Sequence, residues 1–319
     1  LFPYTTLFRS GRRVYTAKDT YTDKKTPSNA TTLTGTVTPG YLDGGTYVVS
    51  GEATCAGDLT FQGDADLILK DGASLTMTGA IVAEEHTLNI YGQAEGTGEL
   101  SATAIRGSIA ISAKNLNVHG GKITITDAYT GISTGSAFTI YNGIINSSGS
   151  DNGIIAYNLM NVYDGEITAS SSGNGSAISL NDGNCKLTIA GGKVTATNTG
   201  NLYGIDAAGE LIITGGTVTA QGGKNTVGEG QVGIFTYGYN ITISGGDVTA
   251  IGGDAKAGSN QDGGAGIDGV LTVNGGTVTA TGGAKDGSGN DGLGISNDYT
   301  ITLNGVTMYE GDSANPTTT

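Results

Sequence analysis

Three long glycine-rich segments contain acidic residues whose side chains and spacing are suited to binding a metal ion. The segments are 221–232, 251–265 and 281–293. Asp262 lies four residues before Gly266 and Asp291 three before Gly294, and an isoleucine follows each of these glycines. Carboxylate and carbonyl oxygens are the ligands that calcium prefers. One interpretation is that Asp262 and Asp291 bind calcium together with Asp268. The other is that they are solvated turn formers.

Aromatic side chains are the second group of residues that could bind a ligand. Tyr141 and Tyr163 occupy the same position in successive repeats, so we expect them to point outward on adjacent turns. The other aromatic candidates follow the isoleucines that open repeat units; they are Tyr157, Phe235, Tyr237 and Tyr239. Exposed rings in a row can stack on the apolar faces of ligands. Stabilisation of neighbouring strands by ring pairs is the alternative interpretation.

An internal repeat must position these residues. Its marker is the second residue of the turn in strings such as LTVNGGTVTA, and the spacing ranges from 22 residues (Gly121 to Gly143) to 30 (Gly246 to Gly276). The markers are Gly121, Gly143, Gly165, Gly192, Gly216, Gly246, Gly276 and Val306. Apolar residues recur five and three positions before each marker and two positions after it, with mostly polar residues between. Alternation with period two is the pattern of strands with one buried face.

A third strand opens most units at an isoleucine. These residues are Ile132, Ile154, Ile178, Ile205, Ile234, Ile267 and Ile295. Each unit then holds three short strands, and it can bury its apolar side chains only by stacking on its neighbours. The sequence therefore predicts an all-β fold, a right-handed parallel β-helix with three strands per turn. Residues 105–319 would supply about eight regular turns, and 31–104 the irregular N-terminal turns and cap.

The first thirty residues differ from the rest of the chain. We interpret residues 1–10 as a non-native, adaptor-derived sequence and residues 11–30 as a flexible linker. The net charge is −14, although six of the 15 basic residues lie in these thirty positions. The acidic remainder disfavours nucleic acid and anionic membranes as partners. Since the sequence has no apolar run of 18 residues, we expect no membrane insertion.

The strings GIDAAGELIITGGTVTAQGG and GIDGVLTVNGGTVTATGG resemble repeats of secreted bacterial carbohydrate-binding parallel β-helix domains, such as those of gut-bacterial surface proteins. The resemblance implies an extracellular or cell-surface location, with polysaccharide or a host or cell-wall glycan as the partner and calcium as a cofactor. In that family the opening isoleucine often sits beside an aspartate. Asp206 and Asp268 match this pattern, whereas Ser133, Ser179 and Ser296 replace the aspartate in other units. The candidate calcium ligands are therefore Asp206, Asp262, Asp268 and Asp291.

Three functions remain open on the sequence alone. The first is a non-catalytic surface module that binds polysaccharide. The second is a structural stalk or adhesin segment, with no small-ligand site, that presents other domains of a larger chain. The third and least favoured is a polysaccharide lyase or hydrolase. Arg106 is the only arginine within the repeats, the histidines His86 and His119 are far apart, and HExxH and Walker motifs are absent.

Overall fold

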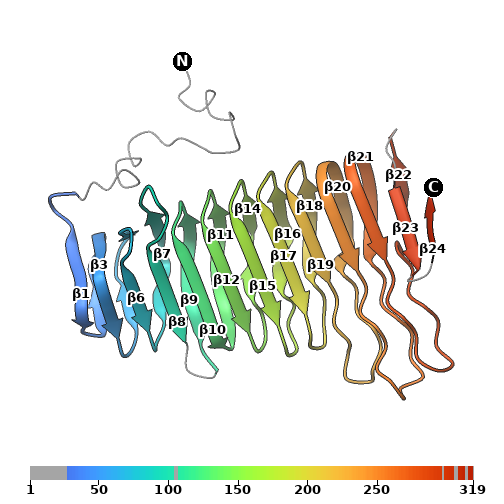
Figure 1. Cartoon of the computed structure of the whole chain (residues 1–319), viewed down its shortest axis with the longest axis horizontal. Coiled ribbons are helices and arrows are strands. Elements are labelled where there is room, and N and C mark those ends of the chain that lie inside the picture. The colour runs from blue at the N-terminus through green and yellow to red at the C-terminus, as the bar shows by residue number, and fades with distance from the viewer. Residues whose placement is uncertain (1–26, 104–106, 297, 305–307, 313–314, 319) are drawn as a thin grey trace.

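The chain coils into one elongated parallel β-solenoid (Figure 1). The computed structural model describes residues 27–103, 107–296, 298–304, 308–312 and 315–318. Every strand pairing between turns is parallel, and strands of successive turns stack along the long axis of the molecule. The predicted all-β parallel β-helix, with three strands per turn, is therefore confirmed.

Three faces run along the solenoid, which we call the opening, second and third faces in chain order. The opening face contains β2 (Gly40–Leu42), β4 (Leu59–Phe61), β13 (Ile154–Ala156) and the first residues of longer strands. The longer strands turn a corner and continue onto the second face. They are β7 (Ile81–Gly92), β9 (Ile109–Val118), β11 (Thr130–Ile140), β16 (Ile178–Ile189), β18 (Ile205–Ile213), β20 (Ile234–Ile251) and β21 (Ile267–Thr281).

The second and third faces meet at the glycine-marked turn. The second face also contains β5 (Ala65–Leu69), β14 (Leu159–Val162) and β22 (Ile301–Leu303), and both faces share β1 (Thr31–Val37), β3 (Gly45–Cys55), β20 and β21. The third face is completed by β6 (Ser74–Met77), β8 (Glu99–Thr103), β10 (Lys122–Ala128), β12 (Ile144–Gly149), β15 (Glu166–Ser171), β17 (Lys193–Asn198), β19 (Thr217–Gln221) and β23 (Met308–Asp312). The last strand, β24 (Asn315–Thr318), pairs antiparallel with β23.

The apolar columns predicted from the repeat are stacked in register. On the second face Ile213 pairs with Ile189 on one side and Ile243 on the other. These side chains belong to one continuous hydrophobic core that runs through the solenoid. The column residues are less buried at the C-terminal end, where Ile301 is exposed and Leu303 is half-buried. The side chain of Met308 lies outside the described residues.

Residues 31–103 continue the same ladders. Leu67 pairs with Ile90, and Ile90 pairs with Val118 of the following turn. On the third face Leu100 pairs with Ile123. Because these residues are buried in the same cluster, the core extends without a break from the N-terminal turns into the repeats.

The turn between the second and third faces requires glycine at the marker. Gly246 has φ +88°, a left-handed conformation that side chains rarely adopt. A Cβ atom built there would also lie 2.6 Å from the carbonyl oxygen of Gly216 in the preceding turn. Close stacking of these turns therefore explains why glycine marks the repeat.

Candidate functional site

A ladder of four rings runs along the corner where the second face ends. The rings of Tyr91 and His119 are 4.4 Å apart, those of His119 and Tyr141 4.7 Å, and those of Tyr141 and Tyr163 5.4 Å. The rings of all three pairs are nearly parallel, with interplanar angles of 8°, 16° and 10°. The predicted placement of Tyr141 and Tyr163 on adjacent turns is observed. However, each inner ring is covered on both faces, an arrangement that fits strand stabilisation better than ligand stacking.

Sequence reasoning overlooked two members of this ladder. His119 stands two positions before its marker glycine, as Tyr141 and Tyr163 do, and Tyr91 occupies the corresponding position one turn earlier. The signal was present in the repeat alignment. The change from tyrosine to histidine at His119 interrupts the aromatic pattern, and Tyr91 lies before the first marker glycine.

A second group of aromatic residues has a different geometry. The ring centroids of Tyr203 and Phe235 are 4.5 Å apart at an angle of 38°, and those of Phe235 and Tyr237 are 4.4 Å apart at 56°. On the opening face Phe235 pairs in register with Asp206 in one neighbouring turn and Asp268 in the other. We call these five residues the aromatic–acid cluster. Because the rings are tilted by 38° and 56°, they do not form a parallel stack like that of the ladder.

The two carboxylates of the cluster are poorly compensated. Asp206 is only 6% exposed, and its Oδ2 accepts a long hydrogen bond of 3.4 Å from the Ser176 hydroxyl. Oδ1 of Asp206 and Oδ1 of Asp268 are buried and have no hydrogen-bond partner. Burial raises the pKa of Asp206 to about 6. Burial, and then the nearby Asp298, raise the pKa of Asp268.

The phenols of the cluster experience the same negative field. Burial raises the pKa of Tyr203 to about 12, with further contributions from Tyr237, Asp206, Asp268 and Glu229. The pKa of Tyr237 is also raised, first by burial and then by Asp206. The salt bridges between described residues lie elsewhere, at Lys122–Glu99, Lys186–Glu210 and Lys193–Glu166. The cluster therefore carries negative charge that its neighbours do not neutralise.

Backbone strain holds one ring of the cluster outward. Tyr237 has φ +52°, a left-handed conformation that costs a non-glycine residue about 1–3 kcal/mol and is concentrated at functional sites. Gly238 continues the turn at φ +80°, and the Thr236 hydroxyl donates a 2.9 Å hydrogen bond to the carbonyl oxygen of Tyr239. As a result Tyr237 and Tyr239 are 54% and 42% exposed.

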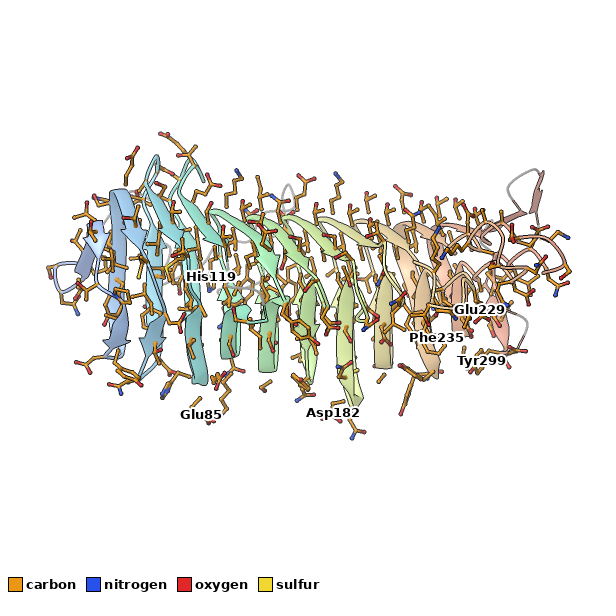
Figure 2. All side chains as sticks on the ribbon, turned by 90° about the horizontal axis from the view of Figure 1, so that it is seen from below. Glu85, His119, Asp182, Glu229, Phe235 and Tyr299 are labelled. Carbon is orange, nitrogen blue, oxygen red and sulfur yellow. The ribbon has the colours of Figure 1, made fainter. Side chains whose placement is uncertain are left out.

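The edge around this turn carries further aromatic residues. A Cβ at Gly238 would lie 2.8 Å from the ring of Tyr299, so that ring covers the turn. Figure 2 shows Phe235, Tyr299 and Glu229 gathered toward the C-terminal end of the solenoid, away from His119. Tyr157, 46% exposed, occupies the same corner three turns earlier. The structure therefore places the predicted Tyr157, Tyr237 and Tyr239 on one edge, separate from the ring ladder.

The carboxylates of the long corners are engaged in holding the loops together. Oδ1 of Asp262 accepts hydrogen bonds from the backbone amide (2.6 Å) and side-chain amide (3.2 Å) of Asn290 in the next turn. Oδ1 of Asp291 accepts a 3.0 Å bond from the amide of Lys285 within its own loop. Among the described residues no group of three or more His, Cys, Asp and Glu side chains is arranged to hold a metal ion. Calcium binding by Asp262 and Asp291 therefore stays a prediction.

The effect of calcium on thermal stability tests this prediction. If Asp262 and Asp291 only connect the loops, the thermal melting curves of the protein in EDTA and in millimolar calcium should coincide. If calcium binds the folded state, it should raise the melting temperature. In that case Asp262→Asn combined with Asp291→Asn should remove most of the increase, and the loop interpretation would be wrong.

Glycines allow the long corners to stack closely (Figure 1). The amide of Gly264 bonds to the carbonyl of Gly253 at 2.9 Å, and the amide of Gly283 to that of Gly264 at 2.8 Å. A Cβ at Gly253 would lie 1.7 Å from the carbonyl oxygen of Gly223. Any side chain at Gly253 would therefore push the loops apart.

We predict that Gly253→Ala destabilises the protein by about 1–3 kcal/mol, the usual cost of overpacking. The control is Gly135→Ala, where the nearest atom to the added Cβ, Cα of Lys114, is 3.9 Å away. Urea denaturation of both variants measures the difference. Equal stability of the two variants would show that the loop stack is not required.

Comparison with known proteins identifies no relative: no family model, no curated protein and no solved structure matches the chain. The described residues include no helix long and apolar enough to span a membrane. Arg106 lies outside the described residues. The fold and the site together define a parallel β-solenoid that carries a partly buried aromatic–acid cluster, with the exposed ring of Tyr237, on one edge.

Proposed function

We propose that this protein is a non-catalytic, extracellular or cell-surface module that binds polysaccharide along the edge bearing Tyr157, Tyr237 and Tyr239. The observation that supports this most directly is the exposure of tilted rings on a rigid scaffold. Tyr237 is held outward at an energetic cost in its backbone. Exposed, tilted rings can cover the apolar faces of sugar units, as aromatic platforms do for other flat apolar groups.

The shape of the solenoid supports a polymeric ligand. Equivalent corners repeat at each turn along a straight edge, at about 4.8 Å per strand. A long saccharide chain lying along this edge can contact rings on several turns at once. Several weak contacts along one chain then act together, because each bound unit raises the effective concentration of the next.

A structural stalk or adhesin segment is the second candidate. The continuous core and the four-ring ladder favour it, because both stabilise the coil whether or not a ligand is present. A polysaccharide lyase or hydrolase is the third. Incubation with pectin, polygalacturonate, xylan and cellulose, followed by assays for reducing ends and unsaturated products, should detect no turnover.

Binding to a glycan array, with affinity electrophoresis on the positive polymers, tests the proposal. We expect Tyr237→Ala combined with Tyr239→Ala to weaken binding at least tenfold. Tyr163→Ala, which removes the terminal ring of the stacked ladder, is the matched control and should retain binding. No binding to any glycan would favour the stalk. Equal loss in the control would show that the ring ladder contributes to the binding surface.

A further inference from the structure

The aromatic–acid cluster has the features of a site for an organic cation. We propose that it binds a protonated amine, and that the polysaccharide is therefore one whose sugars carry free amino groups. This inference rests on the polysaccharide-binding function proposed above and specifies the chemical class of the polymer. Its basis is the combination of tilted rings with a buried, uncompensated carboxylate.

The electrostatic part of the argument depends on Asp206. Its carboxylate is almost completely buried, and Oδ1 has no hydrogen-bond partner. A buried charge without a partner is costly and its field is weakly screened, so it attracts a cation across the short distance to the surface. Asp268 has the same unpartnered Oδ1 on the other side of Phe235. Glu229 contributes to the same field at Tyr203.

The exposed ring of Tyr237 provides the face over which the cation would lie. Phe235 stands between the two aspartates, and the tilted rings of Tyr203 and Tyr237 pack on it. An ammonium group over an aromatic face, within about 6 Å of its centroid, is attracted by the ring quadrupole. The carboxylates in the neighbouring turns strengthen this attraction. Neither a neutral nor an acidic sugar would benefit from that field.

The same geometry argues against a metal ion shared by Asp206 and Asp268. Both pair with Phe235 from opposite sides, so one whole strand separates them. Two strand spacings amount to about 9.6 Å. Calcium needs its oxygen ligands at about 2.3–2.6 Å. A polymer with repeated ammonium groups can instead approach each carboxylate separately.

The test compares hexasaccharides of equal length by isothermal titration calorimetry at 150 mM salt. The ligands are fully deacetylated β-1,4-glucosamine, its N-acetylated form and the corresponding glucose oligomer, with choline as a separate small cation. We expect the deacetylated oligomer to bind at least tenfold more tightly than the other two. Equal binding of all three would overturn the inference and leave the proposed function standing. Binding of choline alone would overturn the amino-sugar assignment.

Variants separate the cluster from the general acidity of the protein. Asp206→Asn combined with Asp268→Asn should abolish the tenfold preference, and Phe235→Leu should reduce it while retaining an apolar side chain. The charge-matched control is Asp247→Asn combined with Glu52→Gln, two exposed acids on other parts of the solenoid. It should change the affinity less than twofold. If the control lost the preference equally, binding would reflect net charge and the site assignment would be wrong.

Discussion

Ile213→Asp is expected to destabilise the solenoid by more than about 4 kcal/mol and to prevent stable folding of the surrounding turns. Ile213 is completely buried, between Ile189 and Ile243 in the second-face ladder. An aspartate there would place a charge in an apolar column without a partner, which costs several kcal/mol. The ladder then loses contacts on both sides of the substitution, because each turn is stabilised mainly by its neighbours.

The neighbouring residue provides the control for this prediction. Ile212 lies on the same strand but points outward, where it is half-buried and pairs with Thr188 and Thr242. Ile212→Asp should cost less than about 1 kcal/mol. Circular dichroism melts and urea titrations of the two variants measure the contrast. Similar behaviour of both would show that the assignment of inward and outward faces is incorrect.

The sequence predicted the fold because the repeat encodes burial directly. Alternation around the marker glycine separates inward residues such as Ile213 from outward residues such as Ile212, and the structure confirms that separation. The register between turns follows from the alignment, because a shift by one residue would expose an entire column. Local patterns of this kind are sufficient to predict which residues form the hydrophobic core.

The chemistry of the outward residues was harder to predict. Asp206 follows an opening isoleucine and was predicted as a calcium ligand, and the structure shows it almost completely buried near Ser176 and Tyr203. Tyr203 and Ser176 come from corners whose lengths differ between turns, and no periodic pattern reveals which corner residues cover a given position. The same reason explains why Asp262 was not expected to bond to Asn290.

Asp206 leads to the second prediction, an unusual dependence of stability on pH. The pKa of its carboxyl is about 6 in the folded protein, above the ordinary value of 3.8, and burial is the main cause. Between pH 3.8 and about pH 6, the folded state therefore keeps a proton on the Asp206 carboxyl that the unfolded state releases. Stability is expected to rise as pH falls from above 6 toward 4, because the buried charge is then neutralised. The difference between a pKa of 3.8 and one of about 6 corresponds to about 3 kcal/mol.

Asp206→Asn should remove this effect. The neutral amide has nearly the same shape, so at pH 7.5 the variant should be about 2–3 kcal/mol more stable than the parent. At pH 4.5 most of the advantage should disappear, because the parent carboxyl is then protonated in the folded state. Titratable neighbours that share this environment, namely Tyr203, Tyr237 and Cys185, all have a raised pKa and remain protonated over this range.

Urea denaturation of the parent and Asp206→Asn at both pH values measures the prediction. Asp268 and Asp151 also have a raised pKa, chiefly through burial, so the parent curve contains contributions besides that of Asp206. The difference between parent and variant isolates Asp206, and Asp247→Asn on the exposed surface controls for the change in net charge. If Asp206→Asn destabilised the protein at pH 7.5, the ionised carboxylate would have a stabilising partner in solution. A bound ammonium group would be such a partner, and adding the deacetylated oligomer should then stabilise the parent more than the variant.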